Sequence, residues 1–224
     1  MRIGPYKNLT EIYSSERSRI YRGVKEGLGK EVIVKVIHGI DQSGLFNEVE
    51  IAKTLTDAYS LVELGRFNDT PVLIRDYMDG QPLLHFIEDG GMAFDIFFDL
   101  AFPLIDALQK LHSSNILHLD VSPANIIVQP KTFHVQLIDY EQSAKLESRD
   151  LLTASLHELE GDLRYMAPER TGRMNRRVEY RSDYYSLGAT FFEMLCGVPP
   201  FVVNDPLTLV HSHLAIIPVS PIEL

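Results

Sequence analysis

The sequence has a single cysteine, no tryptophan and no long uncharged hydrophobic run. Because Cys196 has no second thiol to pair with, an internal disulfide framework and a multi-cysteine zinc centre are excluded. The most apolar stretch, residues 92–111, contains three aspartates and a proline, which are costly in lipid, so no membrane-spanning helix is expected there. The eight histidines form no H-E-x-x-H motif, so nothing indicates a metalloprotease.

The chain also lacks an excess of basic over acidic residues. Its formal net charge is −10, so no positive surface favours nucleic acid as a partner. The first residues, M-R-I-G-P-Y-K-N, contain no apolar signal core, and we expect a soluble cytoplasmic protein. What is present is a hydrophobic fraction of 45% in 224 residues, enough for one large domain or for two small lobes.

The first third of the sequence has the pattern of short strands and turns. A β-branched run, E-V-I-V-K-V-I, has strand length, and the segment after it has helical spacing. The elements expected are a strand Ile20–Arg22 ending in a turn at Gly23, a turn at Gly27–Lys30, a strand Glu31–Ile37, a helix over residues 44–55, and a strand Val72–Ile74 closed by Asp79-Gly80.

The pattern becomes helical from about Pro82. Apolar residues recur at spacings of three and four, which predicts a helix with a core-facing stripe. Short strands are expected at 126–128 and 135–138 and helices at 184–195 and 205–214, while the polar segment 141–162 is left unassigned. The stripe consists of Phe94, Phe97, Phe98, Ala101, Leu104, Ile105, Leu108 and Leu111.

The strongest chemical signal is H-L-D-V-S-P-A-N (residues 118–125), followed after one short strand by I-D-Y (138–140). Asp120 can accept a hydroxyl proton, and Asn125 and Asp139 can hold divalent ions against phosphate oxygens, a set that suits phosphoryl transfer. The alternative is that Asp120 and Asn125 only form turns around Pro123. The strand and Asp139 downstream favour the functional interpretation.

A lysine inside the β-branched run is a second signal. Lys35 is expensive to bury without a partner, and Glu48 on the following helix is a plausible one. Such a pair would hold the ammonium against the phosphates of a nucleotide. The alternative is an edge strand from which Lys35 reaches solvent.

Together these motifs resemble the ordered set of eukaryotic-type Ser/Thr protein kinases: V-I-V-K, Glu48, H-L-D-V-S-P-A-N, I-D-Y, M-A-P-E, S-D-Y-Y-S-L-G and C-G-V-P-P-F. Residues 161–195 resemble most closely the kinase-like domain that heads large bacterial hybrid proteins, which combine it with an ATPase module and a sensor histidine kinase. The resemblance implies an α+β, two-lobed fold with an N-lobe over residues 1–78 and a helical C-lobe over 79–224. It also implies a protein substrate and, in a longer architecture, those further modules as partners.

The resemblance assigns roles residue by residue, with ATP and Mg²⁺ as cofactors. Lys35 would bind the phosphates of ATP, and Glu48 would orient Lys35. Asp120 would be the catalytic base, and Asn125 and Asp139 would be the Mg²⁺ ligands.

Further positions follow from the same resemblance. Ala167-Pro168-Glu169 would close the activation segment, and Asp183 would anchor the catalytic loop through backbone hydrogen bonds. Residues 74–78 would be the hinge against which adenine stacks. The nucleotide-binding residues expected in addition to Lys35 and Glu48 are Ser15, Ser18, Ile20, Ile33, Asp76, Tyr77 and Met78.

The sequence departs from the kinase pattern at several positions. Ser15 and Ser18 stand where a phosphate-binding loop has glycines, which weakens ATP binding without excluding it. Leu119 replaces the arginine that pairs with a phosphorylated activation loop, so switching by loop phosphorylation is not expected. Other departures are Ser122 for a lysine, Asp162 for a threonine and Glu141 for a glycine.

These departures leave three functions open. The first is an ATP-dependent Ser/Thr protein kinase that transfers the γ-phosphoryl group to a protein hydroxyl. The second is a pseudokinase that binds nucleotide or a partner, and the third is a small-molecule phosphotransferase of the aminoglycoside or choline type. The C-lobe is also expected to be truncated before the arginine that pairs with this glutamate in similar domains, which would leave Glu169 without an obvious partner.

Overall fold

The computed structural model describes residues 2–15, 17–38, 42–55, 62–67, 70–146, 161–174 and 176–223. The chain forms two compact units, Met1–Asp79 and Gly80–Leu224, each with its own strands and helix or helices. Among the helices in these described ranges, none combines the length and apolarity needed to cross a membrane.

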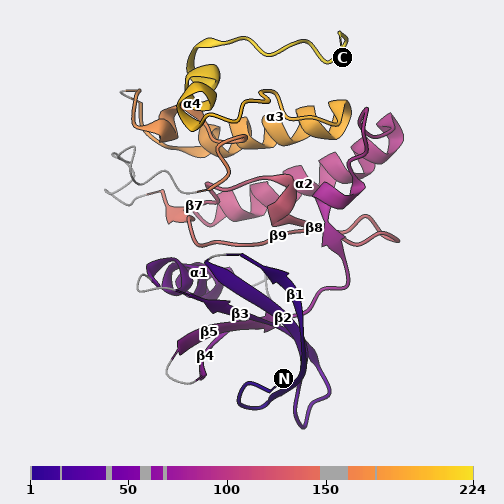
Figure 1. Ribbon diagram of the computed structural model, residues 1–224, viewed down its shortest axis with the longest axis vertical. Coiled ribbons are helices and arrows are strands. Elements are labelled where there is room, and N and C mark those ends of the chain that lie inside the picture. The colour runs from indigo at the N-terminus through magenta and orange to yellow at the C-terminus, as the bar shows by residue number, and fades with distance from the viewer. Residues whose placement is uncertain are drawn as a thin grey trace. The chain divides into compact units, whose positions relative to one another are not determined.

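The first unit is built on a five-stranded antiparallel sheet with the order β1-β2-β3-β5-β4 (Figure 1). One helix, α1 (Ser43–Thr54), packs beside β4 and β5. The strands are β1 (Tyr6–Ser14), β2 (Ser18–Lys25), β3 (Glu31–Ile37), β4 (Val62–Phe67) and β5 (Thr70–Asp76).

The alternation of β3 decides which side chains α1 covers. The valines at its even-numbered positions lie in a buried cluster with residues of β1, β2 and β5. On the opposite face, Ile37 packs with Leu45 and Val49 of α1. Lys35 lies two residues before Ile37 and therefore shares the face that α1 covers.

Two expectations for this unit are wrong. Gly23 is not a turn, because β2 continues through it to Lys25 and the reversal comes at residues 26–28. Gly23 is needed there for packing, since a Cβ at this position would lie 2.5 Å from Cδ2 of Leu9. The strand β4 was also missed, because V-E-L-G-R-F carries a glycine and two charges in six residues.

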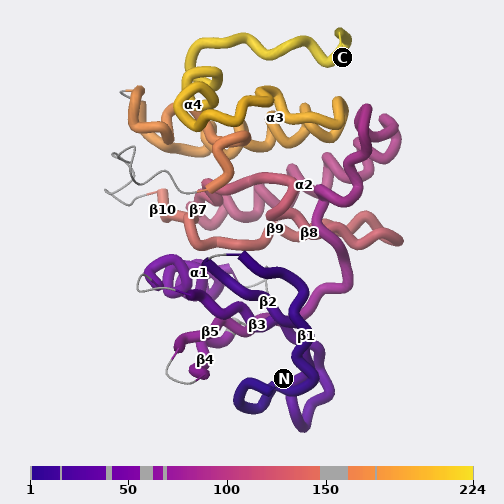
Figure 2. Tube along the Cα trace, in the orientation of Figure 1, coloured from indigo at the N-terminus to yellow at the C-terminus, as the bar shows by residue number. Residues whose placement is uncertain are grey.

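The second unit is mainly helical, with short strand pairs. Helix α3 lies against α2, and Phe97 and Phe191 meet edge to face across that contact (Figure 1). The strands form a three-stranded sheet, β6-β8-β9, and a pair, β10-β7. Figure 2 labels β7, β8, β9 and β10 along the trace. The elements are β6 (Gln81–Pro82), η1 (Leu83–Phe86), α2 (Phe94–Ser113), β7 (Ile116–Leu117), η2 (Pro123–Asn125), β8 (Ile126–Val128), β9 (Val135–Leu137), β10 (Ala144–Lys145), η5 (Pro168–Thr171), α3 (Tyr180–Cys196) and α4 (Pro206–Ala215).

The predicted core-facing stripe of α2 is only half buried. Phe97, like most of the aliphatic positions, is in the core, whereas Phe94 is 71% exposed and Phe98 is 50% exposed. Ile105 is also exposed. The residues at spacings of three and four extend over more than one side of the helix, and α2 packs against α3, β7 and β9 with only part of that surface.

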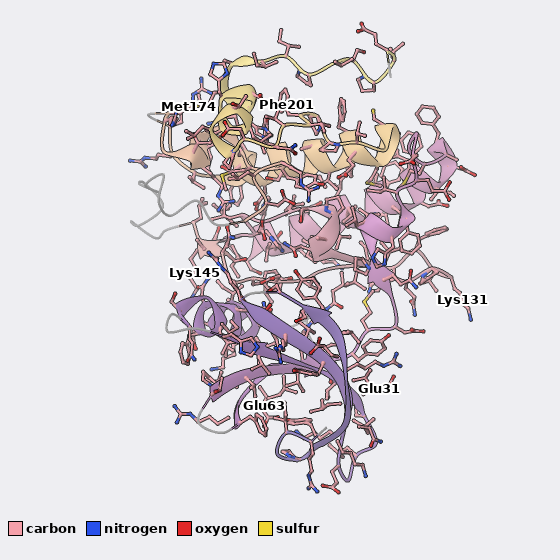
Figure 3. The ribbon with its side chains drawn as sticks, viewed as in Figure 1. Glu31, Glu63, Lys131, Lys145, Met174 and Phe201 are labelled. Carbon is pink, nitrogen blue, oxygen red and sulfur yellow. The ribbon has the colours of Figure 1, made fainter. Side chains whose placement is uncertain are left out.

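The last two helices have clear ends. Helix α3 begins at Tyr180, before the expected start at residue 184, with a capping box between Glu179 and Ser182, and it ends at Gly197 in the left-handed conformation. Helix α4 begins after Asp205, whose carboxylate accepts the backbone N–H of Thr208 at 2.7 Å. Phe201 lies close to α4 (Figure 3), with its ring centroid 4.9 Å from that of His213. Of the unassigned polar segment, residues 147–160 lie outside the described residues.

Candidate active site

The catalytic-loop motif runs from the end of β7 through η2, and a buried carboxylate from α3 holds its backbone. Asp183 accepts the N–H of His118 at 2.9 Å and the N–H of Leu119 at 2.8 Å. His112 Nε2 donates to the same carboxylate at 2.7 Å. Asp183 is fully buried, so these three donors compensate its charge where water does not reach. The backbone anchoring expected of Asp183 is therefore present.

The carboxylate of Asp120 is held at both oxygens. Asn125 Nδ2 donates to Oδ2 at 2.7 Å and also to the Asp120 backbone carbonyl at 2.9 Å. The N–H of Asp162 lies 3.3 Å from Oδ1. Gly161 has no side chain and a φ of +103°, and a Cβ there would lie 2.6 Å from Oδ1, so the chain can approach Asp120 this closely only with glycine.

Burial raises the pKa of the Asp120 carboxyl, and the negative charge of Asp139 raises it further. The nearby His118, the amide of Asp162 and the guanidinium of Arg170 act in the opposite direction. The net effect is a raised pKa, which brings the group closer to the range useful for a general base.

The β8-β9 hairpin brings Asn125 and Asp139 together. Ile126 pairs with Leu137, and the N–H of Ile138 donates to the carbonyl of Asn125 at 2.9 Å. Asp139 has a φ of +67°, a left-handed conformation that is uncommon for a residue with a side chain. Glu141, which replaces the glycine of similar motifs, is not at positive φ, and it lies in a turn closed by the hydrogen bond from the Ser143 N–H to the Tyr140 carbonyl at 3.1 Å.

The donor set on this hairpin fits a magnesium ion. Because Nδ2 of Asn125 is used by Asp120, its amide orientation is set, and Oδ1 has no hydrogen-bond partner in the described parts of the chain. A carboxylate and an amide oxygen are the hard ligands that Mg²⁺ prefers. These are Asp139 and Asn125, the two residues expected from the sequence.

In the first unit, the expected ion pair between β3 and α1 is present. Lys35 Nζ lies 3.0 Å from Glu48 Oε2, and the two side chains are 7% and 4% exposed. The alternative of an edge strand is wrong, because β3 is flanked by β2 and β5. Lys35 is therefore held by the sheet on which it lies and by the helix packed over it.

Two of the expected nucleotide-binding residues share a face with Lys35. Ile20 of β2 is the register partner of Lys35, and Ile33 lies two residues before it on β3. Ile33 is buried and Ile20 is partly buried. One face of the sheet thus combines an ammonium group with two aliphatic side chains.

The expected hinge residues follow the end of β5. Asp76 pairs with Val32 in the sheet and accepts from Lys30 Nζ at 2.8 Å. The N–H of Tyr77 donates to the carbonyl of Glu31 at 3.2 Å, and Arg22 stacks on the Tyr77 ring with its Cζ 3.9 Å from the centroid. Figure 3 labels Glu31 on the sheet of this unit.

Met78, the last of the hinge residues, directly follows Tyr77 and is partly buried.

The serines that stand in place of loop glycines bind one another. Ser15 and Ser18 join β1 to β2, and the N–H of Ser15 donates to the carbonyl of Ser18 at 2.8 Å. Oγ of Ser15 accepts the N–H of Ser18 at 3.0 Å and lies 3.3 Å from the N–H of Arg17. The amides that a glycine-rich loop would offer to phosphates are thus bound within the turn.

The structure supplies a partner for Glu169. Ser182 Oγ, at the start of α3, donates to Glu169 Oε1 at 2.5 Å. The expectation that Glu169 lacks an obvious partner is therefore wrong: a hydroxyl of the α3 capping box binds it. Asp162, in turn, pairs through both carboxylate oxygens with Arg164.

Sequence reasoning missed Arg170 and Gln142. Arg170 donates to the backbone carbonyl of Leu119 and, at 2.8 Å, to Gln142 Oε1. No motif spacing indicates this contact, because one acceptor is a main-chain oxygen and the three segments are far apart in the sequence. The only available signal was an arginine directly after A-P-E.

Comparisons with known proteins agree with this geometry. The family model described as the protein kinase domain matches residues 6–219. A probable serine/threonine-protein kinase of Bifidobacterium longum is 28% identical over 94% of this chain and 29% of its own length. A DNA damage-responsive serine/threonine-protein kinase of Deinococcus radiodurans is 30% identical over 94% of this chain and 32% of its own.

A third relative, the serine/threonine-protein kinase PknB of Mycobacterium leprae, is 30% identical over 67% of this chain and 24% of its own length. The chain thus spans about a third or less of these three curated relatives. The family model covers nearly all of the chain, and its α+β architecture, a sheet followed by helices, is the one expected. This chain belongs to the protein kinase domain family.

Proposed function

We propose that this chain is a serine/threonine protein kinase domain that transfers the γ-phosphoryl group of Mg-ATP to a hydroxyl group of a protein. The observation that carries the proposal is the catalytic loop, in which Asp120 is held by Asn125 and the backbone before it by Asp183. The relatives named above are serine/threonine kinases, which supports the same chemistry.

Asp120 is the proposed base. Its carboxylate accepts the proton of the attacking serine or threonine hydroxyl as the oxygen bonds to the γ-phosphorus and the bond to the β-phosphate oxygen breaks. The hydrogen bond from Asn125 keeps one oxygen oriented, and burial raises the pKa toward that of a useful base.

Asn125 and Asp139 are the proposed magnesium ligands. When bound, the ion neutralises charge on the phosphate oxygens, which is most of what phosphoryl transfer requires. The chain contributes the positions of the two ligands: the β8-β9 hairpin holds Asn125 beside residue 138, and the left-handed backbone turns Asp139 out of the strand.

Lys35 is the proposed phosphate-binding residue, and Glu48 is the residue that orients it. Ile20 and Ile33 would contact the nucleotide base, since they offer apolar surface on the Lys35 face. Asp76, Tyr77 and Met78 would form the hinge. Because the Tyr77 amide is used by Glu31, the adenine contacts fall to the backbone groups of its neighbours.

The other two functions have less support. A pseudokinase commonly loses one of the lysine, glutamate, aspartate or asparagine groups, and all are present here. A small-molecule phosphotransferase is disfavoured because the family model and the relatives above are protein kinases. We also propose ATPase and sensor histidine kinase modules as partners, on the basis of the resemblance described above. A cytoplasmic location, where ATP is abundant, is proposed as well.

Phosphate transfer from labelled ATP tests the proposal. With Mg²⁺ and a generic protein substrate, the wild-type chain should label itself or the substrate, and Asp120→Asn should reduce the rate by at least about a hundredfold. Asp99→Asn, an exposed carboxylate on α2, is the matched control and should remain active.

A second readout separates the alternatives. If labelling is absent but Mg-ATP raises the melting temperature, the pseudokinase function is correct. ATP consumption only in the presence of an aminoglycoside or choline would identify a small-molecule kinase. An absence of both labelling and stabilisation would refute a nucleotide-dependent role.

A further inference from the structure

The peptide group that precedes Asp120 is held at both ends. Its N–H, on Asp120, lies 3.2 Å from Nδ1 of His118. Its carbonyl, on Leu119, accepts a hydrogen bond from the Arg170 guanidinium. Since this peptide plane directs the Cα–Cβ bond of Asp120, these two contacts set the direction of the carboxylate.

Leu119 needs this support because its backbone is strained. It has a φ of +63°, a left-handed conformation that is unfavourable for a residue with a side chain. Asp183 holds its N–H from one side. Among the described residues, Arg170 is the side chain that holds its carbonyl from the other.

Arg170 also joins segments that are distant in the sequence. It belongs to η5, directly after A-P-E, and its second nitrogen donates to Gln142, three residues beyond Asp139. A Cβ on Gly161 would lie 3.0 Å from the Gln142 amide, so the residue before Asp162 packs here as well. The Arg170 guanidinium, which belongs to η5, therefore binds both the catalytic loop and the segment that follows the proposed metal ligand Asp139.

Because residue 119 is a leucine, the positively charged side chain beside the catalytic loop comes from another segment. Kinases regulated by loop phosphorylation have an arginine there, whereas Leu119 is buried and uncharged. Arg170 places a positive charge beside the same loop without any phosphate group, because its guanidinium binds the Leu119 carbonyl.

We propose that Arg170 is a positioning residue that orients Asp120 through the Leu119 carbonyl and makes the loop geometry independent of phosphorylation. This inference rests on the proposed kinase function. It goes beyond that function because it assigns a role to a residue outside the motifs that hold the nucleotide, the metal or the proton.

Steady-state kinetics of Arg170→Met test the proposal. Misplacement of the base should lower kcat by about tenfold to a hundredfold, while KM for ATP stays within about twofold because Lys35, Asn125 and Asp139 are untouched. Arg170→Lys, which keeps a charge and a donor, should recover part of kcat. Because an unfolded fraction would also lower the apparent kcat without changing KM, kcat is calculated from the folded concentration given by circular dichroism.

Arg173→Met is the matched control, because Arg173 is exposed and lies three residues away in the same segment. Its kcat should equal that of the wild type. Treatment of the wild type with a protein phosphatase should leave kcat within about twofold. A tenfold loss on dephosphorylation, or an Arg170→Met kcat equal to that of the wild type, would overturn the proposal.

Hydrogen–deuterium exchange of the nucleotide-free protein provides a readout without activity. Peptides that contain residues 118–120 should exchange at least about threefold faster in Arg170→Met than in Arg173→Met. If the wild type transfers no phosphate, the kinase function fails, and this exchange difference still decides whether Arg170 holds the loop. Equal exchange in the two variants would show that it does not.

Discussion

Lys35 Nζ lies 3.0 Å from Glu48 Oε2, and both side chains are almost completely removed from solvent. Glu48 lies on α1, and Lys35 lies on the central strand of the sheet that α1 covers. A buried pair of this kind adds little net stability over well-packed apolar side chains, but removal of one partner leaves the other charge uncompensated. Loss of one partner should therefore cost more stability than loss of both. Single and double substitutions of this pair can thus separate an effect on stability from an effect on function.

The first prediction separates these two effects. Glu48→Leu alone should destabilise the protein by on the order of 3–5 kcal/mol, because it removes the carboxylate that is ion-paired with a buried ammonium. The double variant Lys35→Met/Glu48→Leu should regain most of that stability and still fail to transfer phosphate. Denaturant unfolding and labelled-ATP assays of the variants measure the two effects. A double variant that is no more stable than Glu48→Leu would contradict this account of the pair.

The second prediction concerns the turn between β1 and β2. Ser15 Oγ binds the amides of Arg17 and Ser18, so those donors are not free for phosphates. Ser15→Ala should release them and lower KM for ATP by about twofold to fivefold, in line with one modest hydrogen bond. ATP titration checks this, with Ser14→Ala at the end of β1 as the control. A raised KM would show that the serine helps to bind the nucleotide.

The third prediction concerns Glu169 and α3. Ser182→Ala removes the hydroxyl that donates to Glu169 Oε1 and also half of the capping box of α3. We expect a loss of about 1–2 kcal/mol of unfolding free energy. Ser186→Ala, one turn later, removes a buried hydroxyl that, among the described residues, bonds only to a carbonyl of its own helix, and it should cost less. Equal losses measured by urea unfolding would mean that the Glu169 contact is not significant.

The fourth prediction is a pH dependence of stability that arises from His213. This side chain is buried against Phe201, with Nδ1 2.7 Å from the Tyr185 hydroxyl, and burial lowers its pKa below the ordinary value of about 6.5. A histidine whose pKa is lower in the folded state favours folding fully above its unfolded pKa. That contribution is lost as the pH falls from about 6.5 through the folded pKa.

Unfolding free energies at pH 7.5 and pH 5.5 measure this contribution. The wild type should lose more stability over that interval than His213→Gln, which cannot be protonated there. His211→Gln, an exposed position on the same helix, should behave like the wild type. The same pH loss in His213→Gln and in the wild type would assign the effect to another group, such as the buried His118.

Much of the local structure follows from short-range patterns. The β-branched run became β3 with the expected bounds, and α1 and α4 lie within one or two residues of the expected helices. The pairing of Lys35 with Glu48 was also expected, since a buried lysine needs a carboxylate and the next helix offered one. The turn at Gly23 and the fully core-facing stripe of α2 were wrong, because both depend on which neighbours pack against them.

By itself, the sequence determined the order of the chemical groups and the elements that carry them. The reason is that strand and helix propensities and short motifs each depend on a few neighbouring residues. Only the tertiary structure decided that Arg170 reaches the Leu119 carbonyl, that Ser182 binds Glu169, and that Leu119 and Asp139 adopt left-handed backbones. These features join residues that are 13 and 51 positions apart, or strain a residue that prefers another conformation. Such contacts and strain exist only once the surrounding packing outweighs the local preference.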